Sequence, residues 1–311
     1  MATRIDKPLL GIALKLAAVA IFVAMQGLVK AATEEVPPGE AVFFRSFFAM
    51  PVILIWLFAG HGGLAGVRTS NPVGHLWRGL LGTGGMGLRF AGLAILPFAE
   101  VAAIGYAAPL FTVIFAAMFI GERVRAFRLV AVGLGLAGVL IVLAPRLGNF
   151  GAGDPLAALG AMFVLLSAVS AALAQTFVRR MVETEETAAI VFWFSAIASV
   201  LALATLPFGW VVPSWPVTVM LVCAGLMGGV GQVCITSAYR YADAGAIAPL
   251  DYASMLLAVL VGVWFFDEVP GLATLAGSAL VVAAGIVIIL RERRLGLERD
   301  RAKRVRNETS G

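Results

Sequence analysis

Four ionisable side chains interrupt otherwise apolar stretches of this sequence: Lys15, Arg45, Arg89 and Asp251. On an insertion scale, a charge at the centre of a membrane helix costs about 2.5–3.5 kcal/mol. If all four faced lipid, the cost would be roughly 10 kcal/mol, which is comparable to the stability of a whole domain. We therefore expect these side chains to face a water-filled cavity or one another. Glu100 and Arg78 lie at the ends of such stretches and are expected to meet headgroups or water.

Each of the four permits more than one interpretation. Arg45 is either an anchor for a substrate, because a guanidinium binds planar acceptors in a fixed fork, or an arginine that reaches the membrane interface. Arg89 lies deeper and is expected to face a cavity. Lys15 is close enough to the end of its stretch to reach the interface. Asp251 either forms an ion pair, for instance with an arginine, which we favour, or titrates and relays protons.

Aromatic and amide side chains at the same depth are further candidates for a binding site. Tyr106 and Tyr252 occupy equivalent positions of an internal repeat, and both are expected to contact the ligand. Other aromatic residues could stack on a flat ligand or simply pack between helices: Phe43, Phe44, Phe90 and Trp193. Three amides either hold helices together or line the cavity: Gln26, Gln175 and Gln232.

The composition identifies the solvent of these stretches as lipid. Hydrophobic residues make up 61% of the 311 residues and charged residues 13%, whereas soluble domains are near half apolar and a quarter charged. The apolar runs are too long and continuous for barrel strands, so each is expected to be a helix. The net charge of +5 reflects membrane topology and predicts no nucleic-acid partner.

Ten membrane spans are expected, and the protein should therefore be an all-α membrane protein. Their approximate ranges are Leu9–Val29, Ala41–Gly60, Gly74–Leu93, Ala99–Ile120, Phe127–Leu143, Pro155–Val178, Ala188–Leu206, Val217–Tyr239, Gly245–Phe266 and Leu272–Leu290. With the N-terminus in the cytoplasm, only Lys30 and Arg146 among the basic loop residues fall outside. The positive-inside rule then places both termini in the cytoplasm. The expected location is a bacterial-type inner membrane.

The chain contains two related halves of five spans. The stretch Ala99–Arg123 returns as Gly245–Glu268, 146 positions later, so that Tyr106 matches Tyr252 and Glu122 matches Glu268. At the same offset three glycines match three others: Gly79, Gly82 and Gly85 with Gly225, Gly228 and Gly231. Because five is an odd number, the second half must be inverted, a construction typical of secondary transporters. We expect repeats at 1–145 and 154–291 and a basic cytoplasmic tail at 292–311.

Two residue types in these repeats are expected to shape the helices. Pro109 and Pro249 should kink their spans, because proline lacks the amide donor of a helix. Glu122 and Glu268 end equivalent spans, where a carboxylate is unfavourable to the helix dipole. We expect these two carboxylates to cap neighbouring helices and not to bind the substrate.

Nothing in the sequence indicates an enzyme, a cofactor or a metal centre. Cys223 and Cys234 are eleven residues apart on one expected helix, about 16 Å along its axis, too far for a disulfide. His61 and His75 are expected in one polar loop. The run Gly82–Gly87 matches G-x-G-x-x-G, but that motif needs a strand before it and here lies within a membrane helix.

These features together resemble the EamA family of the drug/metabolite transporter superfamily over residues 9–291. The ending Phe119-Ile120-Gly121-Glu122-Arg123 resembles the closing motif of that family's fourth span, and Arg45 matches a common position; the second copy departs from the motif with Asp267 in place of glycine. The resemblance implies a metabolite carrier with a central cavity and alternating access. Members include amino-acid exporters, S-adenosylmethionine carriers and riboflavin carriers.

The stretch from Pro37 to Ala49 is similar to riboflavin uptake carriers of this superfamily, and a flat flavin would suit the aromatic candidates. We therefore expect a transporter of a small organic molecule, with riboflavin uptake as the named prediction. The alternatives are export of amino acids or related metabolites, transport of S-adenosylmethionine, and a receptor or structural role. Whether the protein forms a homodimer is left open.

Overall fold

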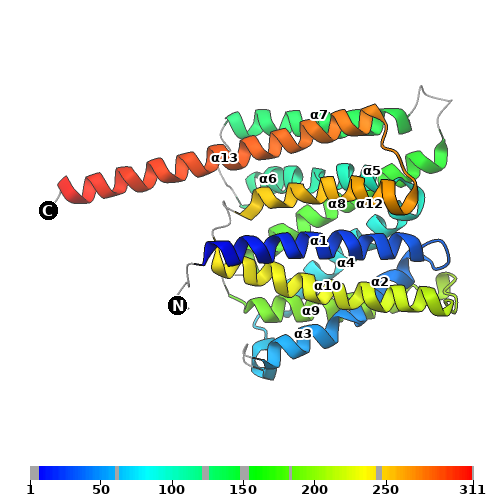
Figure 1. The fold of residues 1–311 in the computed structure, drawn as a ribbon. Coiled ribbons are helices and arrows are strands. Elements are labelled where there is room, and N and C mark those ends of the chain that lie inside the picture. Colours follow the sequence, from blue (N-terminus) through cyan, green and yellow to red (C-terminus); the bar gives the residue numbers. More distant parts are fainter. Residues whose placement is uncertain are drawn as a thin grey trace.

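The computed structural model describes residues 7–59, 63–120, 126–147, 154–181, 184–242 and 247–309. In this part of the chain every regular element is a helix, and most helices run roughly parallel or antiparallel to one another (Figure 1). Both chain ends lie toward the same end of this bundle in Figure 1. Glu122, expected to cap a helix, lies outside the described residues, as does His61.

The described residues of the first half form seven α-helices and one short 3-10 helix. They are α1 (Pro8–Ala32), α2 (Pro38–Phe47), α3 (Ala49–Phe58), η1 (Gly63–Val67), α4 (Pro72–Ile95), α5 (Phe98–Gly105), α6 (Ala107–Ile120) and α7 (Ala126–Leu147). The run Gly82–Gly87 lies within α4, so it is helical and forms no dinucleotide-binding loop.

The described residues of the second half form five α-helices and two 3-10 helices. They are α8 (Pro155–Met181), α9 (Thr187–Leu203), η2 (Leu206–Phe208), α10 (Trp215–Tyr241), η3 (Ala248–Tyr252), α12 (Ala253–Phe266) and α13 (Leu272–Thr309). The last helix continues well past the expected end at Leu290 and extends beyond the bundle (Figure 1). Cys223 and Cys234 both lie on α10 and are free thiols.

Prolines break three of the expected spans. The pair α2 and α3 is interrupted at Phe48, three residues before Pro51, and the pair α5 and α6 at Tyr106, three residues before Pro109. A proline cannot donate to the carbonyl four residues earlier and its ring crowds that turn, so the helix breaks just before it. The segment containing Pro249 is the 3-10 helix η3. The kinks expected at Pro109 and Pro249 are therefore present.

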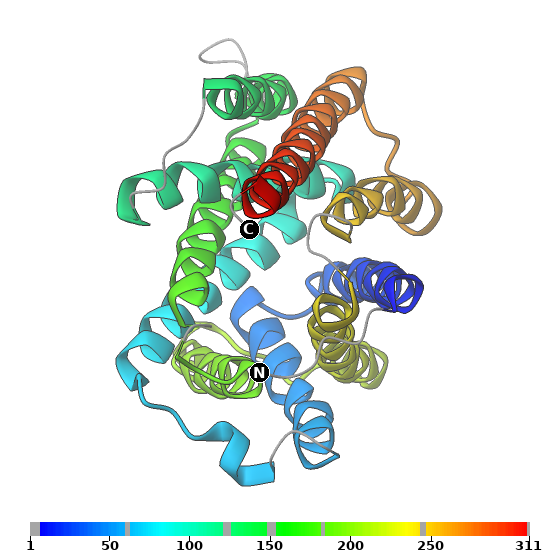
Figure 2. The same ribbon diagram turned by 90° about the vertical axis from the view of Figure 1, so that its left-hand side faces the viewer.

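Helices from the two halves pack against one another in a regular pattern. The pair α1 and α10 and the pair α4 and α8 make extensive contacts, as do α7 with α13 and α2 with α9. Figure 2 looks along the bundle and shows α7 and α13 together on one side of it. Each of these pairs joins one helix from residues 1–147 to one from residues 154–309.

Glycines allow these helices to approach closely. On α4, a Cβ at Gly79 or Gly82 would lie 2.4 Å from Ile197 or 2.7 Å from Phe194, both on α9. The matching glycines of α10 contact the first half instead: a Cβ at Gly225 would lie 2.5 Å from Phe48, and one at Gly228 would lie 3.2 Å from Arg45. Small residues at helix contacts are typical of membrane bundles, and here they bring α4 and α10 against opposite halves.

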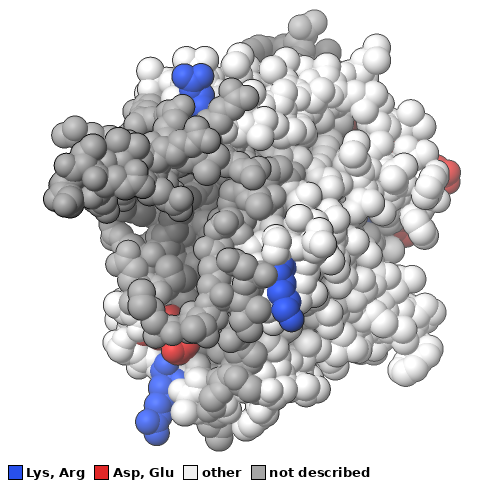
Figure 3. Space-filling model, turned by 60° about the vertical axis from the view of Figure 1, so that its left-hand side comes forward, with Lys and Arg blue, Asp and Glu red and all other residues white. Residues whose placement is uncertain are grey.

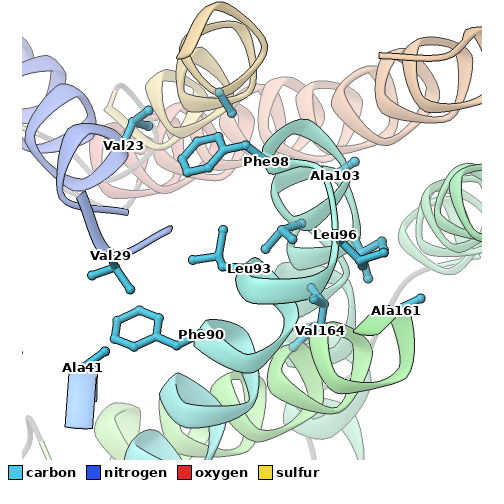
Figure 4. Close-up of a cluster of buried hydrophobic side chains, with 14 of the residues drawn as sticks. Val23, Val29, Ala41, Phe90, Leu93, Leu96, Phe98, Ala103, Ala161 and Val164 are labelled. Atoms are coloured by element: carbon cyan, nitrogen blue, oxygen red, sulfur yellow. The ribbon is translucent and has the colours of Figure 1, made fainter. Parts of the chain in front are cut away.

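The main apolar core fills the middle of the bundle and continues to the end opposite the chain termini. Phe90 and Leu93 of α4 and Leu96, the residue after α4, pack there with Phe98 and with small residues of α8 (Figure 4). At this end Lys30 forms an ion pair with Glu268 at 2.7 Å and donates to the carbonyl of Leu96, also at 2.7 Å.

Glu268 also accepts a hydrogen bond from the backbone N–H of Phe98 at 2.7 Å, at the first residue of α5. The carboxylate thus caps a neighbouring helix, as the sequence predicted, because the free N–H groups of a helix start need acceptors. Glu100, which the sequence left at a membrane end, is bound by the Arg146 guanidinium through two hydrogen bonds of 2.7 and 2.8 Å.

The outer surface is suited to lipid. Large apolar side chains are exposed on it, among them Leu9, Trp264 and Phe265, which are each more than 70% exposed. The described surface in view in Figure 3 is almost entirely uncharged. Among the described residues, seven stretches are long and apolar enough to cross a membrane, and α9 and Leu250–Phe266 are shorter apolar helices. The protein is therefore a multi-pass membrane protein. Helix α4 is not among these seven stretches; it carries Arg78, Arg89 and many glycines.

A buried carboxylate ties the loop before α9 to the start of α4. Glu185 accepts hydrogen bonds from the Ser70 N–H and hydroxyl at 2.8 Å each, and from the Asn71 N–H at 2.9 Å. The imidazole of His75 lies 3.2 Å from its other oxygen. The sequence placed His75 in a polar loop, but it lies buried in the first turn of α4. Burial opposes ionisation of Glu185, yet these hydrogen bonds outweigh it and lower the pKa of the carboxyl to about 2.

Replacing Glu185 with Gln is expected to lower the midpoint of thermal unfolding at pH 7 by roughly 3–10 °C, because charged hydrogen bonds are lost. The folded pKa lies below the ordinary value of 4.5, so this stabilisation is present above pH 4.5 and is lost as the pH falls toward about 2. The difference between the variant and the wild type should therefore shrink at pH 3, as measured by tryptophan fluorescence in detergent. The exposed neighbour Glu186 provides the control, Glu186→Gln, and equal effects of the two substitutions would contradict this assignment.

Candidate functional site

Two adjoining cavities lie within the bundle. The first, of about 260 Å³, is lined by Tyr106, Asp251 and Ser254 among others, and we call it the tyrosine cavity. The second, of about 330 Å³, is lined by Arg45, Arg78 and Phe194 among others, and we call it the arginine cavity. Three residues line both cavities: Gln26, Arg89 and Gly105. These three therefore mark the boundary between the two.

Arg89 is held in place at this boundary by its neighbours. Its Nε donates to the Gln26 side-chain oxygen at 2.8 Å, and the Gln26 amide donates in turn to the Phe22 carbonyl at 3.1 Å. The guanidinium lies so close to α5 that a Cβ at Gly105 would be 2.3 Å from Arg89 Nη1. Arg89 thus faces the cavities, as the sequence predicted for a charge that cannot face lipid, and Gln26 both lines them and joins two helices.

The tyrosine cavity brings together the two repeat-equivalent tyrosines. Their rings stack with centroids 5.2 Å apart and an interplanar angle of 27°. The Tyr106 hydroxyl donates to the Asp251 backbone carbonyl and lies within hydrogen-bonding reach of the Ser254 hydroxyl. Tyr106 lines the cavity, whereas the Tyr252 hydroxyl points at Gly285 of α13, where a Cβ would lie only 1.5 Å away. Tyr106 is therefore available to a ligand, whereas Tyr252 stacks on the Tyr106 ring and directs its own hydroxyl toward α13.

Asp251 forms an ion pair with Lys15, with 2.7 Å between Nζ and Oδ1. The Lys15 side chain is 1% exposed and that of Asp251 is 45% exposed. An ion pair was the favoured expectation for Asp251, but its cation is Lys15 and not an arginine. The expectation that Lys15 reaches the membrane interface is wrong, because this carboxylate gives the ammonium a partner inside the bundle.

The arginine cavity holds two guanidinium groups around one aromatic ring. The guanidinium carbon of Arg78 lies 4.0 Å from the centroid of the Phe194 ring, and that of Arg45 lies 5.9 Å from it. Arg45 is only 6% exposed, so it is buried in the bundle and does not reach the membrane interface. Arg78, which the sequence placed at a span end among headgroups or water, lines this cavity instead.

Besides Tyr252, four predicted site residues are not among the described residues that line either cavity. Phe43 packs against Phe47 and Trp210, and Phe44 stacks on Phe48. Trp193 donates its indole N–H to the Val67 carbonyl at 2.9 Å. Gln232 lies half-buried on α10. Gln175 and Phe90, which the sequence also considered, do line the arginine cavity.

Three cavity residues were missed by reasoning from the sequence. Arg78 was discounted because it follows the start of its helix by only six residues. A second offset of 149 pairs Phe43-Phe44-Arg45-Ser46 with Phe192-Trp193-Phe194-Ser195. Phe194 is therefore the repeat equivalent of Arg45 and could have been considered beside it. Ser254 gave none, because a serine in a span is unremarkable. Among the described residues, no group of three or more metal-ligating side chains could hold a metal ion.

The sequence of the whole bundle matches one known family. The EamA-like transporter family matches residues 9–144 and 158–291. The chain belongs to this family. The match covers both cavities and all the residues that line their shared boundary, and it confirms the resemblance drawn from the span-four motif.

Curated EamA-family relatives carry different substrates. The chain is 31% identical over 282 residues to a pseudopaline exporter of Pseudomonas aeruginosa, covering 89% of this chain and 95% of the relative. It is 28% identical over 255 residues to an S-adenosylmethionine uptake transporter of Rickettsia felis, covering 82% and 84%. It is 31% identical over 262 residues to a riboflavin transporter of Rhizobium johnstonii, covering 83% of each. These names are those of transporters, so the protein is a transporter and not an enzyme.

A solved crystal structure has the same fold. It superposes with a TM-score of 0.66 at 25% sequence identity and covers 92% of this chain and 98% of its own. The helical bundle described above is therefore that of a known protein architecture.

Replacing Gly105 with Ala is expected to lower transport about tenfold or more, the effect of 1.4 kcal/mol in binding. The added Cβ would meet the flexible end of Arg89, so the guanidinium must leave Gln26 while the helices stay in place. The matched control is Gly84→Ala on α4, where a Cβ would have nothing within 4 Å. Both variants are compared by their initial rates of solute uptake into vesicles, normalised to protein level. A fall in protein level for Gly105→Ala would show that the position matters for folding.

Proposed function

We propose that this protein is a secondary transporter of the bacterial inner membrane that moves a small organic metabolite by alternating access. The solute binds at the boundary of the two cavities, where Arg89 and Gln26 lie. Arg45 and Tyr106 contact the solute from either side, and Asp251 with Lys15 forms part of the wall. The two halves of the chain rock around this site.

The position of the cavities between the two halves carries this proposal. The tyrosine cavity takes its walls from α1, α4, α5 and α6 on one side and from η3 and α12 on the other. The arginine cavity takes its walls from the first half and from α8 and α9 of the second. A site built in this way changes shape whenever the halves move, which alternating access requires.

Ten spans in two inverted repeats with both termini in the cytoplasm form part of the proposal. The glycines of α4 contact α9 while their repeat equivalents on α10 contact α2, and this exchange of partners is expected of two halves related by a two-fold axis. The loops at the end of the bundle opposite the chain termini contain few basic residues, which supports an orientation with both termini in the cytoplasm. The closed packing at that end, with Lys30 and Glu268, would then face outward.

Riboflavin is the substrate that the sequence named, and it remains one candidate. A riboflavin transporter is among the relatives, and so are a pseudopaline exporter and an S-adenosylmethionine uptake transporter. The aromatic side chains expected to hold a flat flavin are dispersed, since Phe43, Phe44 and Trp193 pack away from the cavities. Transport of S-adenosylmethionine and export of amino acids or related metabolites are therefore the alternatives to be tested beside it.

Purified protein in liposomes is expected to catalyse saturable counterflow of at least one solute from a labelled panel of riboflavin, S-adenosylmethionine, amino acids and carboxylates. Arg89→Gln and Tyr106→Phe should each lower this rate, because the first removes the charge at the boundary and the second removes a hydroxyl bonded to Asp251 and Ser254. Protein level and monodispersity are measured in parallel, so that a folding defect is recognised.

Binding of a solute without movement of any solute would contradict the proposal and favour a receptor. The same assay separates an ion pair from a proton relay at Asp251. If transport is independent of pH in both the wild type and Asp251→Asn, the carboxylate acts through its pairing with Lys15. A pH dependence that Asp251→Asn abolishes would show that Asp251 carries a coupled proton.

A further inference from the structure

The arginine cavity carries positive charge without a compensating acid. Arg45, Arg78 and Arg89 all line it, and none of the described residues that line it is acidic. Elsewhere in the described bundle two lysines have carboxylate partners, Lys15 with Asp251 and Lys30 with Glu268. The arginine cavity differs from these two sites because its cations have no carboxylate partner among the described residues.

Two nitrogens in each of the guanidinium groups of Arg45 and Arg78 also lack a hydrogen-bond acceptor. For each residue, Nε and Nη1 are buried and have no hydrogen-bond partner among the described residues. The ring of Phe194 accounts for one face of each guanidinium, but a cation–π contact does not accept the N–H hydrogens, which lie in the guanidinium plane. Buried donors without acceptors are costly, and charged ones more so.

Two cations that share one cavity repel each other more strongly there than in water, because the surroundings have a lower dielectric constant. Water could accept hydrogen bonds but would not neutralise the charge. An anion with planar oxygens would do both, since a guanidinium fork matches carboxylate and phosphate in geometry. The unpaired donors and the missing acid thus call for the same kind of ligand.

We infer that the transported solute is a small organic anion whose carboxylate or phosphate group is bound between Arg45 and Arg78, with the rest of the molecule reaching toward Arg89. This inference rests on the proposed transport function and names its substrate class. It makes Arg78 and Phe194 specificity determinants, with Phe194 setting the spacing of the two guanidinium groups.

The shape of the cavity fits an organic molecule better than an inorganic ion. Its volume of about 330 Å³ lies at the lower end of the range for small-molecule pockets. Arg78 and Arg89 are eleven residues apart on α4, about 16 Å along the axis, so the charged groups are spread along the cavity. Met86 and Phe90 line the wall with apolar surface, which suits a carbon skeleton.

Equilibrium binding by the full-length protein in phosphatidylcholine nanodiscs tests this inference without relying on transport. The probes are three anions, each with a neutral counterpart: glutarate with glutaramide, benzoate with benzamide, and glycerol 3-phosphate with glycerol. Thermal stabilisation is titrated with each probe. At least one anion is expected to bind about tenfold or more tightly than its counterpart, and the preferred pair tells carboxylate from phosphate.

Arg45→Gln and Arg78→Gln should each weaken binding of that anion about tenfold or more, whereas Arg68→Gln, in the exposed segment before α4, should leave it within about twofold. Arg45→Lys keeps the charge but loses the fork, so intermediate affinity from a stable protein excludes a mere folding effect. Equal binding of all anions and their counterparts, or undiminished affinity in both Gln variants, would overturn the inference.

Two further outcomes separate the possible sources of failure. If phosphatidylglycerol in the nanodisc stabilises the wild type but not Arg78→Gln, and blocks the soluble anions, the arginines bind a lipid headgroup and the inference is wrong. If an anion binds with the expected dependence on Arg45 and Arg78 but no solute moves in liposomes, the inference stands and the transport proposal fails. If a neutral or cationic solute moves unaffected by either variant, transport stands and the inference fails.

Discussion

A guanidinium group cannot be left in hydrocarbon, and the arrangement of this protein follows from that constraint. Arg45, Arg78 and Arg89 come from α2 and α4, and the bundle keeps open space around all three. This space lies beside very close contacts, because glycines on α4 and α10 allow these helices to pack directly against α9 and α2. The positions of the glycines and the arginines along the helices therefore determine where the bundle is closely packed and where it is open.

The charged residues of the bundle fall into two groups with different consequences. At the ends, carboxylates are fully engaged: Glu268 binds Lys30 and caps α5, Glu100 binds Arg146, and Glu185 holds the start of α4. These contacts close and fix the helix ends. In the arginine cavity the cations lack carboxylate partners among the described residues, so binding energy remains available there for a solute. A carrier needs this division, because its frame must hold while its site changes occupants.

Much of the helical architecture could be predicted from the sequence, whereas the site could be predicted only in part. Long apolar runs and prolines determine helices and kinks locally, so the approximate helix ranges and the breaks near Pro109 and Pro249 could be predicted from the sequence. Arg89 could be placed in a cavity because exposing its charge to lipid would cost too much free energy. Which ring meets which cation depends on the rotation of each helix, and the sequence does not reveal this: Phe194 faces Arg45 and Arg78, while its neighbour Trp193 bonds to the Val67 carbonyl. The partner of Lys15 was likewise hidden, because Asp251 lies over two hundred residues away.

A structure of the protein with its transported solute in nanodiscs tests most directly whether the solute binds in the arginine cavity. We expect density for an anionic group in contact with both Arg45 and Arg78, with the remainder of the molecule extending along α4 toward Arg89 and Gln26. Solute density confined to the outer ends of the bundle, or a solute in the tyrosine cavity with the arginines still without an anion, would contradict it.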